Sequence, residues 1–266
     1  TIELTLKKGC RYIEVSTDIT NTVRDHFLRV CFPTGVDAEK TWAEGSFIIT
    51  EYPTKRIDPI KQLPRHPAQL WFDIYDGQKG LAVLLDSPKD YEVIQDTKGY
   101  TLAMSVVRSV RLRIPCDNRL WMEYPGDESA QCLKRIVYRY ALMPHQEPPY
   151  NGSLYKESLA FNTPMRACQF GKQQGSLPLA YSFMEITAPN LILSAIKKAE
   201  DRDSMIVRLY NPTDSETKGL IKFGFKLREV YLVKCNEERI QKLSSNGNSV
   251  ELKVGKGKIV SLEVVI

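Results

Sequence analysis

Apolar and polar residues alternate with a period of two along most of this chain, and no other sequence feature constrains its fold as strongly. In residues 12–19, one face of the predicted strand carries Ile13, Val15, Thr17 and Ile19, and the other carries Tyr12, Glu14, Ser16 and Asp18. Successive side chains of a strand point to opposite faces, so the pattern indicates strands with one buried face. The alternation returns at 28–32, 70–75, 100–114 and 136–142, whereas Gly80–Leu85 is apolar throughout, as in a central strand.

The composition of the sequence changes between Pro144 and Pro164, where prolines are frequent. One short helix is predicted inside this connector at Leu154–Phe161, with Ser153 as its capping residue. Beyond the connector, strand-like segments follow one another about every ten residues, with turn signals between them. We therefore expect an all-β chain of two antiparallel β-sandwich units, a larger one with long loops at 1–164 and a smaller one at 165–266.

Composition narrows the class of protein. The chain has 266 residues, enough for one large domain or two ordinary ones, and its 42% hydrophobic and 26% charged residues are typical of globular proteins. The net charge of +5 is thinly spread, which argues against a nucleic-acid partner, and no apolar run is long enough to span a membrane. The six cysteines form no CxxC pair and fit reduced thiols in a cytoplasmic protein.

The first residues, TIELTLKK, already alternate, and no initiator methionine or signal peptide precedes them. We expect that the upstream part of a longer protein is missing, together with at least one neighbouring strand. A sheet without that neighbour exposes an edge and apolar surface. The chain is therefore expected to depend on a partner, and self-association remains an open alternative.

Motifs for self-sufficient catalysis are missing from the sequence. It contains no GxSxG, no GxGxxG after a strand, no P-loop and no HExxH, and its three histidines are far apart. Two groups of carboxylates, Asp90 with Glu92 and Glu200 with Asp201 and Asp203, have the residue types of acid–base glycoside chemistry. The second group reads more simply as a solvated turn. We predict neither a catalytic residue nor a metal ligand in this chain.

Arg108 breaks the pattern of its own strand. It falls in the apolar phase of residues 100–114, where an arginine is rarely buried without a partner. Either a bulge turns it outward, or it points into a cleft and pairs with an acid or with ligand hydroxyls. Arg111 and Arg113 lie on the other phase and are expected in solvent.

The aromatic residues raise the idea of a sugar-stacking surface. Trp42, Trp71 and Trp121 are the tryptophans of the chain. Trp71, however, lies between two core-phase residues and is expected to pack on the opposite face of its sheet. Large aromatic side chains more often belong to a core than to a binding platform.

Five blocks, in order along the chain, resemble the C-terminal β region of glycoside hydrolase family 38, the α-mannosidases, and most closely its bacterial mannosylglycerate hydrolase-like branch. They are RDHFLRVCFPTG (24–35), FDIYDGQKGLAVLLDSPKDYEV (72–93), TLAMSVVRSV (101–110), AQCLKRIVYRYALMPH (130–145) and LSAIKKAEDRDSMIVRLYNPT (193–213). Two positions depart from the bacterial pattern. Phe27 stands where a basic residue is usual, and Tyr75 where serine is frequent.

The resemblance implies a larger enzyme around this chain. Such enzymes place an α/β barrel and a helical bundle before their β-sandwich domains, and their zinc ligands, nucleophile and acid/base carboxylate lie there. The retaining reaction on a mannoside substrate would then occur outside this chain, which would support the barrel and form one wall of the active site. The family brings an arginine from the β region to the catalytic cleft, and Arg108 is the candidate for that substrate-binding role. The alternatives are a free-standing carbohydrate-binding β module and a structural protein without a ligand.

Overall fold

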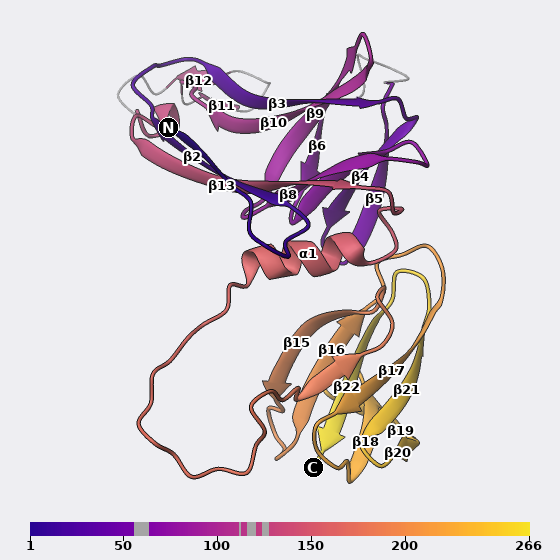
Figure 1. The fold of residues 1–266 in the computed structure, drawn as a ribbon. Coiled ribbons are helices and arrows are strands. Elements are labelled where there is room, and N and C mark those ends of the chain that lie inside the picture. The colour runs from indigo at the N-terminus through magenta and orange to yellow at the C-terminus, as the bar shows by residue number, and fades with distance from the viewer. Residues whose placement is uncertain (56–63, 112, 116–120, 124–127) are drawn as a thin grey trace. The chain divides into compact units, whose positions relative to one another are not determined.

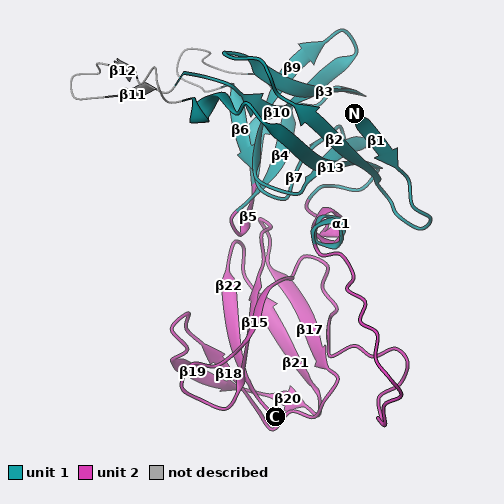
Figure 2. Ribbon diagram, turned by 90° about the vertical axis from the view of Figure 1, so that its left-hand side faces the viewer, with its two compact units in different colours: residues 1–45, 50–149, 157–162 teal, residues 46–49, 150–156, 163–266 magenta. Residues whose placement is uncertain are grey.

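The computed structural model describes the chain except residues 56–63, 112, 116–120 and 124–127. The described part confirms the all-β prediction, because antiparallel strands dominate and α1 (Ser153–Asn162) is its one α-helix, accompanied by a 3₁₀ turn at Ser129–Gln131. Two compact units make up the chain (Figure 2). The first contains residues 1–45, 50–149 and 157–162, and the second contains residues 46–49, 150–156 and 163–266. The predicted boundary after residue 164 stays a prediction.

The first unit contains a seven-stranded sheet and a four-stranded sheet (Figure 1). The larger sheet has the order β1 (Ile2–Thr5), β2 (Ile13–Thr20), β13 (Arg135–His145), β8 (Gly80–Leu85), β7 (Trp71–Tyr75), β4 (Lys40–Gly45) and β5 (Ile48–Pro53). The smaller has the order β3 (Phe27–Val36), β10 (Gly99–Arg108), β9 (Lys89–Asp96) and β6 (Arg65–Ala68). A separate pair consists of β11 (Arg113–Pro115) and β12 (Trp121–Glu123).

The core of the first unit follows from the alternation in these strands. Phe72 on β7 stacks on Tyr91 of β9 with ring centroids 4.3 Å apart, and Phe32 of β3 meets Tyr140 of β13 edge-on at 5.7 Å. Burying one large aromatic side chain contributes about 1.5–3 kcal/mol, so these four rings stabilise the packing of the two sheets. At the edge strand β1, Ile2 and Leu4 are each 67% exposed.

Helix α1 lies where the connector was expected to hold a short helix. Asn151 accepts a hydrogen bond from the backbone N–H of Ser153 at its start (2.9 Å), and Asn162 at its end donates to the backbone oxygen of Leu85 (2.8 Å). Phe161 packs edge-on against Tyr12 within the first unit. The side chain that binds the helix start is therefore Asn151, two residues before the predicted cap.

The second unit is also built from two antiparallel sheets. One has the order β14 (Met184–Ile186), β17 (Thr217–Phe223), β21 (Ser249–Val254) and β20 (Ser245–Asn246). The other has the order β15 (Ile192–Lys198), β16 (Met205–Tyr210), β22 (Ile259–Val265), β18 (Glu229–Val233) and β19 (Arg239–Leu243). Residues 46–49 complete this unit: Phe47 meets Tyr210 edge-on at 5.1 Å, and the N–H of Ile49 donates to the backbone oxygen of Pro212 (3.3 Å).

A fully buried carboxylate organises the charged face of the larger of these two sheets. Glu263 on β22 accepts hydrogen bonds from Arg239 (2.7 and 2.8 Å), Arg202 (2.9 Å) and the hydroxyl of Ser204 (2.8 Å). The bonds from Arg239, opposed by burial and assisted by Ser204 and Arg202, lower the pKa of Glu263 from 4.5 to about 2. Its charge is therefore present in the folded protein at neutral pH.

We predict that Glu263→Gln lowers the free energy of unfolding by about 3 kcal/mol at pH 7, because both arginines then face a neutral partner. Since the folded-state pKa is depressed, the stabilisation by Glu263 is complete above about pH 4.5 and is lost as the pH falls towards 2. Urea denaturation at several pH values should show that the difference in free energy of unfolding between the wild type and the variant becomes smaller as the pH falls. Glu251→Gln, in the exposed pair with Lys218, is the control and should change stability by less than about 0.5 kcal/mol. A difference in the free energy of unfolding that is independent of pH would contradict the lowered pKa of Glu263.

Candidate functional site: an arginine cluster at the end of β10

A bulge in β10 decides which way Arg108 points. The register of β10 against β3 shifts between Ser105 and Val107. Before the shift Leu102 and Met104 are buried, and after it Val107 and Ser109 are buried instead. Because one extra residue reverses the alternation, Arg108 becomes exposed and Val110, which the simple period places in the core, is 47% exposed.

The guanidinium of Arg108 lies beside an exposed aromatic ring. Phe27, at the start of β3, is the register partner of Arg108 and is 40% exposed. Three guanidinium groups from three strands surround its ring, with distances from carbon to ring centroid of 5.4 Å for Arg29, 5.4 Å for Arg65 and 5.7 Å for Arg108. Each contact of this kind contributes about 0.5–1 kcal/mol at an exposed site, so the ring helps to hold three like charges close together.

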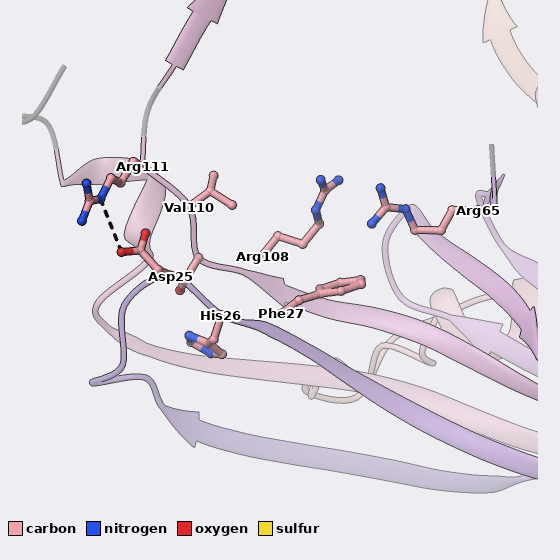
Figure 3. A pocket seen from close by; sticks show the side chains of 8 residues that line it. Asp25, His26, Phe27, Arg65, Arg108, Val110 and Arg111 are labelled. Atoms are coloured by element: carbon pink, nitrogen blue, oxygen red, sulfur yellow. Dashed lines mark ion pairs between the residues drawn. The ribbon is translucent and has the colours of Figure 1, made fainter. Parts of the chain in front are cut away.

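These three arginines differ in how their charge is compensated. Arg29 forms an ion pair with Glu92 on β9 (2.7 Å). Arg65 and Arg108 form no ion pair with any carboxylate of the residues that the structure describes. Figure 3 shows their side chains extending towards each other on the same side of Phe27. The cluster therefore presents two guanidinium groups whose hydrogen-bond donors remain available.

A hollow of about 550 Å³ adjoins the cluster. Its lining residues are Asp25, His26, Phe27, Arg65, Arg108, Ser109, Val110 and Arg111. Asp25, the carboxylate among these described lining residues, is engaged already: it accepts from the amide of Gln131 (2.9 Å) and pairs with Arg111 at 3.5 Å. The bond from Gln131, and then the charge of Arg111, lower the pKa of Asp25 against the opposing effect of partial burial. Arg111 is exposed, as the sequence predicted, whereas the side chain of Arg113 lies outside the described residues.

A buried hydrogen-bond network fixes the backbone next to Arg108. The amide nitrogen of Asn21 donates to Ser109 Oγ (3.0 Å) and to the backbone oxygens of Gln131 and Cys132 (3.1 Å each). Ser109 Oγ donates to the same oxygen of Gln131 (2.6 Å), and its N–H donates to the backbone oxygen of His26 (2.8 Å). The network joins residues more than 100 positions apart, and the sequence alone gave no signal for it.

Two planar guanidinium groups next to an aromatic ring can bind a carboxylate, a phosphate or vicinal hydroxyls. The fork of donors on an arginine matches two oxygens of such a group, and the ring offers an apolar face for stacking. Among the residues that the structure describes, no three His, Cys, Asp or Glu side chains gather as metal ligands would. The cluster therefore has the chemical groups needed to bind and orient a ligand.

The other sequence candidates do not assemble into a site. Trp71 is fully buried in β7, Trp42 is half-buried and donates to Glu51 (3.3 Å), and the side chain of Trp121 lies outside the described residues. Glu92 is engaged with Arg29, and Asp90 accepts from Ser105. The group of Glu200, Asp201 and Asp203 lies in the turn between β15 and β16, in agreement with the simpler of the two readings.

The sequence did not single out a buried acid–base pair in the larger sheet of the first unit. His145 Nε2 lies 2.8 Å from Asp73 Oδ1, and both side chains are almost completely inaccessible to solvent. Burial opposes charge on His145, but the hydrogen bond and the charge of Asp73 raise its pKa overall. A Cβ atom on Gly80 would lie 2.5 Å from the His145 ring, so a glycine is required there. Because solvent does not reach either group, we read this pair as structural.

Comparison with known proteins identifies the family. Residues 1–112 match the glycosyl hydrolases family 38 C-terminal domain, and residues 190–262 match the glycosyl hydrolases family 38 C-terminal beta sandwich domain. The two matches together cover most of the chain, in the expected order. The chain belongs to glycosyl hydrolase family 38 and corresponds to the C-terminal β region of that family.

Among curated proteins, the chain is 28% identical over 264 residues to a protein of Halalkalibacterium halodurans named "Putative mannosylglycerate hydrolase". The match covers 98% of this chain and 28% of that protein. An alpha-mannosidase from Enterococcus faecalis has the same fold, with a TM-score of 0.79 and 20% identity over 98% of this chain and 28% of its own. A second Enterococcus faecalis structure, a protein in glycosyl hydrolase family 38, has a TM-score of 0.77 and 20% identity, and the match covers 98% of this chain and 29% of that one. The chain thus spans less than a third of the length of each of these relatives.

We predict that Asn21→Ala lowers the free energy of unfolding by about 1–3 kcal/mol, because it removes three buried hydrogen bonds, to Ser109 Oγ and to the backbone oxygens of Gln131 and Cys132. Urea denaturation of the isolated chain would measure this loss, and the dependence of the unfolding free energy on urea concentration should stay unchanged. The control is Asn236→Ala, which removes an exposed and long (3.4 Å) contact with Glu238 and should cost less than about 0.5 kcal/mol. Equal effects of the two substitutions would show that the network does not hold the end of β10.

Proposed function

We propose that this chain is the C-terminal β region of an α-mannosidase-type retaining glycoside hydrolase. It supports the catalytic barrel and the helical bundle of the same enzyme and contributes one wall of the active site. Family membership supports this proposal, as does the share of the relatives that the chain spans. The nucleophile, the acid/base carboxylate and the zinc ligands are assigned to the part of the enzyme outside this chain. A zinc ion would there bind sugar hydroxyls.

The observation that carries the active-site part of the proposal is the pair Arg65 and Arg108, neither of which forms an ion pair with another described residue. Two guanidinium groups that lie over the same ring repel each other, and an anionic or hydroxyl-rich ligand between them would relieve this repulsion. Such a ligand would be held by charge-assisted hydrogen bonds, each about 1.5–3 kcal/mol in strength. We therefore assign Arg108 the substrate-binding role, with Arg65 beside it.

As the ligand of this site we propose mannosylglycerate, the compound in the name of the Halalkalibacterium halodurans relative. Mannosylglycerate combines a mannose with a glycerate aglycone that carries a carboxylate, and we assign the glycerate to the cluster. The carboxylate would bind the forks of Arg65 and Arg108, and the aglycone would lie along Phe27. The chain would thus bind and orient the substrate, while bond cleavage proceeds on residues outside it.

The compartment proposed for the enzyme is the cytoplasm. The five cysteines within the described residues are free, and Cys31, Cys168 and Cys235 are exposed. Exposed thiols persist in a reducing environment. Among the described residues, no helix has the length and apolar character needed to cross a membrane.

We predict that Arg108→Ala in the full-length enzyme lowers kcat/KM for mannosylglycerate by about ten- to a thousand-fold, the range for one oriented charged contact in an active site. Arg108→Lys should restore only part of the loss, because an ammonium lacks the planar fork. The loss should be smaller with a neutral aryl mannoside. Thermal unfolding should hardly change, because Arg108 is exposed.

The matched control is Arg135→Ala, which removes an exposed arginine of the same unit that lies on β13, pairs with Asp18 (2.5 Å) and is not among the described residues that line the hollow. It should leave kcat/KM within about two-fold. Full activity of Arg108→Ala would reduce Arg108 to a surface charge, and a folding defect without a separable loss of activity would make it a structural residue. Mannoside binding by the isolated chain, abolished by Arg108→Ala, together with full activity of the Arg108→Ala enzyme, would instead favour a free-standing carbohydrate-binding module.

A further inference from the structure

The segment of residues 163–183 joins α1 to β14 without forming a helix or a strand (Figure 1). We call it the 163–183 arm. Every residue in it is exposed. A connection of this length without secondary structure is uncommon in a compact domain, and such connections usually bind something or remain as linkers.

The composition of the arm does not fit a linker that stays in solvent. Four large apolar side chains, Met165, Phe170, Leu177 and Leu179, expose between 64% and 111% of their reference area. Solvated linkers are rich in glycine, serine and charged residues, and they contain few aromatic and large aliphatic side chains. Burying each of these four residues would contribute about 1.5–3 kcal/mol, so together they could stabilise a docked arm substantially.

Both ends of the arm are fixed, which limits where its middle can lie. Before it, Asn162 donates to the backbone oxygens of Ser158 (2.9 Å) and Leu85 (2.8 Å). At its other end, the hydroxyl of Tyr181 binds the backbone oxygen of Gly224, whose N–H donates to the oxygen of Phe183 (2.9 Å). A segment that is tied at both ends loses less entropy on docking than a free tail.

We propose that the 163–183 arm docks on the part of the same polypeptide that lies outside this chain. This inference rests on the proposal that the chain belongs to a longer family 38 enzyme. The chain spans only 28% of the relatives with which it aligns, so most of such an enzyme is available as the docking surface. The arm carries Arg166 and Lys172 and no Asp or Glu. The surface that it fits is therefore apolar with acidic groups at its rim.

Limited trypsin digestion tests this inference, because the arm contains two cleavage sites, after Arg166 and after Lys172. Cleavage at these sites should be at least ten-fold slower in the full-length polypeptide than in the isolated chain. Phe170→Ser combined with Leu179→Ser should restore rapid cleavage in the full-length polypeptide and leave the thermal unfolding of the isolated chain unchanged. The matched control, Gln173→Ser with Gln174→Ser in the same arm, should preserve the protection.

Equal cleavage rates in the full-length polypeptide and in the isolated chain would overturn the inference and make the arm a solvated linker. Protection of the isolated chain that grows with its concentration would also overturn it, because a second copy would then be the occupant. None of these outcomes depends on glycosidase activity. An inactive full-length protein with a protected arm would contradict the proposed function alone.

Discussion

The bulge between Ser105 and Val107 determines what the first unit can present to a ligand. A strand with unbroken alternation would point Arg108 into the core, where a guanidinium without a partner is prohibitively costly. One extra residue turns Arg108 outward and places Ser109 inside, within reach of Asn21 and the backbone of Gln131. The exposed charge and the buried polar network are thus two results of the same local irregularity, and neither can be kept without the other.

Alternation was sufficient to predict the all-β class and many of the strands, and a capping residue with helical spacing predicted the short helix, because these depend on residues close together in the sequence. Alternation also marked Arg108 as an anomaly. Alternation could not predict that Arg65 lies beside Phe27, because β6 comes near Phe27 only through the pairing of β6, β9, β10 and β3. The buried carboxylates of Glu263 and Asp73 were hidden for the same reason, since their partners lie more than twenty residues away. Long-range pairing, and not local propensity, determines which polar residues are buried.

Phe27 gives the arginine cluster a character of its own. A basic residue at this position would add a fourth charge to a crowded surface. The ring instead attracts Arg29, Arg65 and Arg108 and keeps their guanidinium groups within 6 Å of one point. A site built in this way combines strong attraction for an anion with an apolar face, which suits a ligand that has both a carboxylate and a carbon skeleton.

Residues 46–49 belong to the second unit although they are encoded before most of the first. Phe47 and Ile49 meet Tyr210 and Pro212, more than 160 positions later in the sequence. On a ribosome, which delivers about 5–20 residues per second, these contacts cannot form until roughly ten seconds or more after residue 49 has been added. During that interval the aromatic ring of Phe47 has no partner from the second unit. Synthesis order therefore leaves this short segment without its long-range contacts until most of the second unit has been made.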